Sequence, residues 1–120
     1  MEDTLYREEI LEHYKNPLNF GKPRNFTISS KQTNPFCGDE IEIFVRLQND
    51  TICEVGFTGL GCTINMASAS ILTEFAKNKT KKELTKFSED DMLHLLGIEV
   101  SETRKKCALL ALAVLKDCLK

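Results

Sequence analysis

Hydrophobic and polar residues alternate from Asp39 to Gln48, and this period of two predicts a strand with one side in the core. The side expected to face the core comprises Asp39, Ile41, Ile43, Val45 and Leu47. The other side, expected to face mostly water, comprises Glu40, Glu42, Phe44, Arg46 and Gln48. This segment gives the clearest strand signal in the chain.

The turn signal Asn49-Asp50 follows this strand and predicts an antiparallel hairpin with the next one. The inward side of the second strand is expected to comprise Cys53, Val55 and Phe57. Upstream, Phe26 and Ile28 indicate an earlier strand. The first half of the chain therefore predicts a small sheet of three strands.

The apolar period changes to three and four residues after Gly61, which predicts a helix. Its stripe comprises Ile64, Ala67, Ser68, Ile71 and Phe75. A short N-terminal helix is predicted to end at Asn16-Pro17, because proline disfavours helix in the residue before it. The apolar face of that helix comprises Leu5, Ile10, Leu11 and Tyr14.

Two short helices are predicted over residues 80–87 and 88–96, with Gly97 as the C-cap of the second. Ser101 is expected to cap a final apolar helix that runs to Leu119. The sequence thus predicts an α+β fold: a small antiparallel three-stranded sheet covered on one face by helices. With 120 residues the chain is expected to form a single domain, residues 1–120.

The net charge of -2 gives no reason to expect a nucleic-acid partner, which normally needs a basic face. The longest apolar stretch, Ala108 to Leu115, is far shorter than a membrane helix, and the acidic, polar N-terminus does not resemble a signal peptide. We therefore expect a protein without membrane segments, either cytoplasmic or organellar after processing. In a reducing compartment its five cysteines, an odd number without close pairs, favour metal or sulfur chemistry over disulfides.

Cys37 and Asp39 flank Gly38 in the turn before the clearest strand, and they resemble half of a metal site. The parity of the strand places the Asp39 carboxylate on the core side, which is costly unless something cationic meets it. Each residue also has an ordinary explanation, because an aspartate often caps a turn and a cysteine often packs as a small apolar residue.

Two further cysteines have settings that favour the thiolate. Cys62 follows a Gly-x-Gly segment and begins a helix, where free backbone N–H groups and the helix dipole favour a negative sulfur. Cys107 follows Arg104-Lys105-Lys106, and nearby cations have the same effect. We interpret Cys53 and Cys118 as core residues, and His13 and His94 as residues on helix surfaces.

Three cysteines and an aspartate match the ligand number of a tetrahedral zinc site or of an iron–sulfur cluster. The four candidates, Cys37, Asp39, Cys62 and Cys107, are widely spaced and lack the CxxC pairs of a zinc ribbon. Spacing alone is therefore a weak argument that they converge.

Four segments together resemble the U-type iron–sulfur cluster scaffold family, which contains NifU N-terminal domains, IscU and SufU. The segments are Tyr6-Arg7 through His13-Tyr14-Lys15-Asn16-Pro17, Asn34-Pro35-Phe36-Cys37-Gly38-Asp39, Gly61-Cys62 with Met66-Ala67-Ser68-Ala69-Ser70, and Arg104-Lys105-Lys106-Cys107. The resemblance implies a SufE/NifU-like fold. It also implies that Cys37, Cys62 and Cys107 are ligand thiols and candidate sulfur acceptors, and that Asp39 is a fourth, weaker ligand.

The chain departs from both family types. IscU-type members carry a histidine before the third cysteine and a Leu-Pro-Pro-Val-Lys segment that a dedicated Hsp70 chaperone reads, whereas this chain has Lys106 and the segment 99–103, Glu-Val-Ser-Glu-Thr. A dedicated Hsp70 partner is therefore not expected. The Arg-x-Lys-Cys pattern and the Ala-Ser-Ala-Ser run are similar to SufU, but residues 63–106 are too few to hold the extra segment of SufU.

The resemblance implies an iron–sulfur cluster assembly scaffold, a binding protein more than an enzyme, that accepts sulfur from a cysteine desulfurase. Such a scaffold binds iron, builds a transient [2Fe-2S] cluster and transfers it to recipient apoproteins or cluster carriers. The alternative is a zinc-dependent sulfurtransferase of the SufU type, with Zn²⁺ at the same four residues. A third hypothesis is a binding module in which zinc is purely structural.

Overall fold

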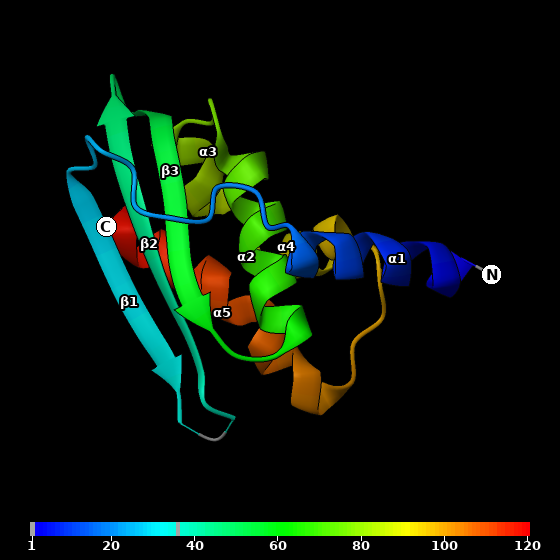
Figure 1. Ribbon diagram of the computed structural model, residues 1–120. Helices are drawn as coiled ribbons and strands as arrows, with labels where there is room; N and C mark the ends of the chain where they lie inside the picture. Colours follow the sequence, from blue (N-terminus) through cyan, green and yellow to red (C-terminus); the bar gives the residue numbers. More distant parts are fainter. Residues whose placement is uncertain (1, 36) are drawn as a thin grey trace.

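The computed structural model describes residues 2–35 and 37–120, with the side chains of residues 7–35 and 37–120 (Figure 1). The predicted apolar side chain of Leu5 lies outside the described side chains. In chain order the elements are α1 (Glu2–Lys15), β1 (Ile28–Asn34), β2 (Asp39–Gln48), β3 (Thr51–Leu60), α2 (Thr63–Ala76), α3 (Lys81–Lys86), α4 (Glu89–Leu96) and α5 (Glu102–Cys118).

The three strands form one antiparallel sheet in the order β1-β2-β3. In this register Ile43 lies opposite Ser30 on β1 and opposite Phe57 on β3. The turn between β2 and β3 places Asn49 and Asp50 at φ 54 and 61, a conformation that these two residue types tolerate and that matches the twist of a hairpin. The predicted hairpin is therefore confirmed.

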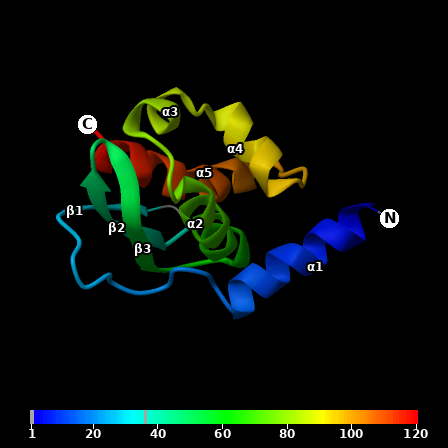
Figure 2. The same cartoon turned by 90° about the horizontal axis from the view of Figure 1, so that it is seen from above.

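Helices α2 and α5 cover one face of the sheet, with α3 and α4 beyond them (Figure 2). Ile41, Ile43 and Val45 on β2 are fully buried in this layer, together with Leu72 on α2 and Ala111 on α5. The predicted α+β fold, a three-stranded antiparallel sheet with helices on one face, is confirmed. Among the described residues no helix is both long and apolar enough to span a membrane.

The opposite face of the sheet is not left to water as the alternation predicted. Phe44 is 5% exposed, because the segment between α1 and β1 crosses over it. The ring of Phe26 packs edge-on against Phe44 at 5.0 Å between centroids, and Lys22 lies over both rings. Periodicity in one strand carries no information about an irregular segment that covers its outer side.

The inward position predicted for Cys53 is wrong. The pairing of β2 with β3 shifts between Arg46 and Leu47, so that Arg46 faces Glu54 while Leu47 faces Ile52. The extra residue of this bulge is Cys53, which is exposed, and Ile52 takes the buried position at 1% exposure. Cys118 is buried at 4% exposure, as predicted for a core residue.

Helix α1 packs against α2, and this contact corrects the prediction for His13. The His13 side chain is half-buried, with Nδ1 2.8 Å from Oγ of Ser70. His94 lies exposed on α4, as predicted. The predicted helix boundaries at Gly97 and Ser101 are also confirmed: Gly97 is a left-handed C-cap with φ 71, and the hydroxyl of Ser101 accepts a hydrogen bond from the Arg104 N–H.

Candidate metal centre

The four predicted site residues come from three places that meet at one end of the molecule. Cys37 and Asp39 lie between β1 and β2, Cys62 lies between β3 and α2, and Cys107 lies in the second turn of α5. Figure 1 shows the beginnings of β2, α2 and α5 and the end of β3 at the same end of the ribbon. The antiparallel order of the strands produces this, because β2 begins where β3 ends.

Cys37, Asp39 and Cys107 face one another directly. Their ligand atoms all lie within 4.8 Å of one another. The Cys37 thiol donates to Oδ2 of Asp39 at 3.1 Å, and its sulfur lies 3.9 Å from the sulfur of Cys107. The structure therefore brings together two thiols that are 70 residues apart in the chain.

Cys62 joins this group through Asp39. Its thiol lies 3.8 Å from Oδ2 of Asp39, and its backbone N–H donates to Oδ1 of the same carboxylate at 2.9 Å. Cys62 is also the N-cap of α2, where its sulfur accepts the backbone N–H of Asn65 at 3.5 Å. The three predicted cysteines thus surround the carboxylate of Asp39.

Asp39 is almost completely buried, at 1% exposure. Burial raises the pKa of a carboxyl group, but hydrogen bonds from the Cys107 thiol, the Cys62 N–H and the Cys37 thiol outweigh it. The pKa of Asp39 is therefore lowered below its ordinary value of 3.8. The carboxyl group is therefore ionised at neutral pH, the form in which a carboxylate binds a metal.

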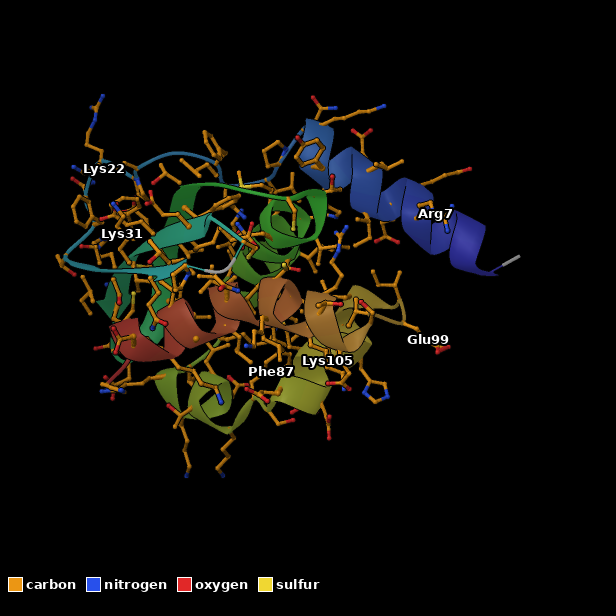
Figure 3. All side chains as sticks on the ribbon, turned by 90° about the horizontal axis from the view of Figure 1, so that it is seen from below. Arg7, Lys22, Lys31, Phe87, Glu99 and Lys105 are labelled. Atoms are coloured by element: carbon orange, nitrogen blue, oxygen red, sulfur yellow. The ribbon has the colours of Figure 1, made fainter. Side chains whose placement is uncertain are left out.

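The thiolate-favouring setting predicted for Cys107 is not what the fold provides. Burial raises the pKa of the Cys107 thiol well above 9.0, and its hydrogen bonds to Asp39 and Cys62 raise it further. Of the three basic residues that were expected to lower this pKa, Arg104 and Lys106 are exposed, and Lys105 pairs with Glu102 at 3.0 Å. Figure 3 shows Lys105 on the first turns of α5.

The close approach of the carboxylate depends on Gly61. A Cβ at this position would overlap Oδ1 of Asp39 and come within 3.0 Å of Nδ2 of Asn65. Gly61 also has φ 136, which side chains rarely permit. The Gly-x-Gly segment noted in the sequence is thus a place where backbone and carboxylate touch.

Cys37, Asp39 and Cys107 lie close enough together to share a single ion, and Cys62 lies beside Asp39 as a fourth candidate ligand. Four ligands around one zinc, with bonds of about 2.3 Å for sulfur, place neighbouring sulfurs about 3.8 Å apart. The distances of 3.9 Å between Cys37 and Cys107 sulfurs and 3.8 Å between the Cys62 sulfur and Asp39 are close to this value. Cys53 and Cys118 lie outside the group, consistent with their exclusion on sequence grounds.

Sequence reasoning missed Asn65, which lies directly behind this group. It is fully buried at the third position of α2, and its carboxamide donates to the Leu60 carbonyl at 3.1 Å. The apolar stripe gave no signal for it, since an asparagine in the first turn of a helix is ordinarily exposed. Its carboxamide lies against the segment Leu60–Cys62, next to Gly61.

The fold is α+β, and it brings three cysteines and an aspartate from distant parts of the sequence together at one candidate metal site. The chain belongs to the NifU-like N terminal domain family, whose model matches residues 5–120. The resemblance drawn from the four sequence segments is therefore confirmed.

Individual relatives divide between two kinds of protein. The zinc-dependent sulfurtransferase SufU of Bacillus subtilis is 37% identical, over 91% of this chain and 85% of the relative. The iron–sulfur cluster assembly scaffold protein IscU 1 of Archaeoglobus fulgidus is 30% identical, over 96% of this chain and 74% of the relative. A crystal structure of a candidate iron–sulfur cluster assembly scaffold for the SUF system, from Fervidobacterium islandicum, superposes with a TM-score of 0.84 at 29% identity, covering 98% of each chain.

Proposed function

We propose that this protein is an iron–sulfur cluster assembly scaffold, which accepts sulfur from a cysteine desulfurase and builds and transfers a [2Fe-2S] cluster. The observation that carries the proposal is the convergence of Cys37, Asp39, Cys62 and Cys107 at one end of the fold. Membership of the NifU-like family and 30% identity to a named IscU scaffold support it. In this proposal the cluster is not a permanent cofactor. The protein binds it during assembly and then transfers it to another protein.

Sulfur transfer requires a thiol that a partner protein can reach. Cys37 is exposed, whereas Cys62 is half-buried and Cys107 is buried. We therefore infer that the Cys37 thiolate attacks the outer sulfur of a persulfide on the desulfurase. The S–S bond of the donor breaks, the donor cysteine leaves as a thiolate, and Cys37 becomes the persulfide.

Asp39 gives the proposed site one ligand of a different kind. A hard carboxylate holds iron in a sulfur-rich cluster less tenaciously than a thiolate does. The carboxylate is kept ionised, and the Cys62 N–H holds its Oδ1 atom in place. Its replacement by a thiolate is therefore expected to slow cluster release.

Anaerobic reconstitution with iron and sulfide tests the scaffold function. The wild type should develop the visible absorbance of a [2Fe-2S] cluster, and Cys37→Ser should lose most of it. Cys53→Ser is the matched control, because Cys53 is also exposed but lies outside the group. Absence of cluster absorbance in the wild type, or equal yield in Cys37→Ser, would contradict the proposal.

A zinc-dependent sulfurtransferase is the second candidate, and one feature of the geometry favours it. A two-iron cluster divides its protein ligands between two metals, whereas Cys37, Asp39 and Cys107 have ligand atoms within 4.8 Å, as around a single ion. Identity of 37% to a named zinc-dependent sulfurtransferase adds support. Here zinc would be held by the same four residues and would keep the thiols deprotonated.

Desulfurase turnover separates the two candidates. A sulfurtransferase should contain zinc when purified without air and should stimulate a cysteine desulfurase strongly, and chelation should abolish the stimulation. A scaffold without resident zinc should reconstitute a cluster and keep its effect on the desulfurase after chelation. If zinc removal unfolded the protein and neither version affected the desulfurase, zinc would be only structural.

A further inference from the structure

Three of the contacts of Asn65 concern the loop before α2. Its backbone N–H donates to the Cys62 sulfur at 3.5 Å, and its side-chain Nδ2 donates to the Leu60 carbonyl at 3.1 Å. The same nitrogen lies behind Gly61, close enough that a Cβ there would come within 3.0 Å of it. A single buried residue therefore ties together both ends of the segment Leu60–Cys62.

This segment holds the carboxylate of the candidate site. The Cys62 N–H donates to Oδ1 of Asp39, and Gly61 leaves the space that the carboxylate occupies. If the loop moved outward, Asp39 would lose its backbone donor and Cys62 would lose its position beside Oδ2. Asn65 thus acts on two candidate ligands without touching the metal position itself.

An asparagine at this position reduces the stability of the fold. Its Oδ1 atom is buried and has no hydrogen-bond partner among the described residues, and such an orphaned acceptor costs stability. An apolar side chain of the same shape would avoid this cost, but it could not donate to the Leu60 carbonyl. The donor, Nδ2, is the part of the side chain that the loop uses.

We propose that Asn65 is a positioning residue of the metal site, which fixes the Leu60–Cys62 loop so that Cys62 and Asp39 are presented together. The inference rests on the proposed function, in that it requires a metal at this site. Residues that orient metal ligands from behind typically contribute 10- to 100-fold to metal affinity. Asn65 is expected to contribute on that scale.

The test compares Asn65→Leu, which keeps the side-chain shape but removes the donor, with Ser68→Ala. Ser68 is a matched control, because it lies on the same helix, is fully buried, and has a hydroxyl with no partner among the described residues. Zn²⁺ affinity is measured by competition with a chelator, and Co²⁺ serves as the spectroscopic probe. Unfolding of the metal-free proteins in denaturant reports on the fold separately.

Asn65→Leu should bind Zn²⁺ at least 10-fold more weakly than the wild type and show weaker thiolate-to-Co²⁺ charge-transfer bands, with little change in the denaturant midpoint of the metal-free protein. Ser68→Ala should bind both metals like the wild type. Asn65→Ser, whose hydroxyl is too short to reach the Leu60 carbonyl, should repeat the loss and serves if the leucine variant does not fold.

Affinity and Co²⁺ spectra of both Asn65 variants within twofold of the wild type would overturn the inference and leave the metal site intact. A loss that matched that of Ser68→Ala, or that followed a lowered denaturant midpoint, would assign Asn65 to the fold alone. If the wild type bound neither metal, the proposed metal site would fail and this inference with it.

Discussion

Helix α5 buries a cysteine near each end, and the two have the same exposure of 4%. Burial raises the pKa of both thiols. Their neighbours differ: Cys107 faces Asp39 and Cys37, whereas the Cys118 thiol donates to the Ile43 carbonyl at 3.6 Å. Burial of a thiol therefore does not distinguish a residue of a metal site from a residue of the hydrophobic core. The difference lies in the further ligand groups that other elements place beside the thiol.

The largest expected effect comes from removing each thiol in turn. Cys107→Ala should weaken Zn²⁺ binding by at least about 100-fold, because it removes one of the candidate ligands. Cys118→Ala should leave the affinity unchanged and lower the free energy of unfolding by about 1 kcal/mol through a small cavity. Chelator competition and denaturant unfolding measure the two quantities. Equal Zn²⁺ affinity in the two variants would contradict the assignment of Cys107 to the metal site and of Cys118 to the core.

Metal-linked stability sharpens the same comparison. With free Zn²⁺ at 100 times its dissociation constant, the wild type and Cys118→Ala should each gain about 2.7 kcal/mol in free energy of unfolding. Cys107→Ala should gain little at the same zinc concentration. Thermal or denaturant unfolding with and without zinc gives the result. A gain in Cys107→Ala equal to that of the wild type would place the zinc elsewhere.

The glycine behind the site gives the next effect. Gly61→Ala adds a Cβ that overlaps Asp39, at a φ of 136 that an alanine rarely adopts. Zn²⁺ affinity should fall about 10-fold, since the carboxylate must turn away from its position. Gly21→Ala is the control, because Gly21 has a similar φ of 125 but open space around it. Similar losses of zinc affinity in the two variants would mean that backbone strain, not the carboxylate, is responsible.

The fold was largely predictable because its strongest signals are local. The alternation of Asp39 to Gln48 predicted β2. The capping residue Gly97 predicted the end of α4, and Ser101 predicted the start of α5. Predictions failed where a second segment decides the outcome. Phe44 is covered by the chain before β1, and Cys53 is displaced by a bulge that depends on the pairing of two strands.

The site was predictable only in part, for a related reason. Local settings singled out Cys37, Asp39, Cys62 and Cys107, but nothing local shows that α5 places Cys107 beside Cys37. The family resemblance supplied that expectation. Asn65 was missed because its importance lies in contacts to Leu60 and Gly61, which exist only after the loop has folded.

A smaller effect concerns pH. Burial, with a contribution from Asp117, raises the pKa of Cys118 from 9.0 to about 12. A thiol that ionises more easily in the unfolded chain contributes stability below the unfolded pKa, about 8.5, which is lost as the pH rises toward 12. Between pH 8 and 10 the metal-free wild type should lose about 1 to 2 kcal/mol more than Cys118→Ala. Denaturant unfolding under reducing conditions measures this, and equal losses would refute the burial of an un-ionised thiol.

The smallest effect is expected at the bulge. Cys53 is exposed, and its thiol donates to the Arg46 carbonyl at 3.2 Å. Cys53→Ser should change the free energy of unfolding by less than about 0.5 kcal/mol and leave metal binding unaltered. A change of several-fold in zinc affinity would show that a thiol outside the group of Cys37, Cys62 and Cys107 takes part in metal binding.

X-ray absorption at the zinc edge of the zinc-loaded wild type tests most directly whether the four residues form one metal site. The account predicts a four-coordinate ion with three sulfur ligands at about 2.3 Å and one oxygen at about 2.0 to 2.2 Å. Cys107→Ala should lose one sulfur from this shell, and Cys118→Ala should keep all three. A shell of only nitrogen and oxygen in the wild type would contradict the assignment of Cys37, Asp39, Cys62 and Cys107 to a common site.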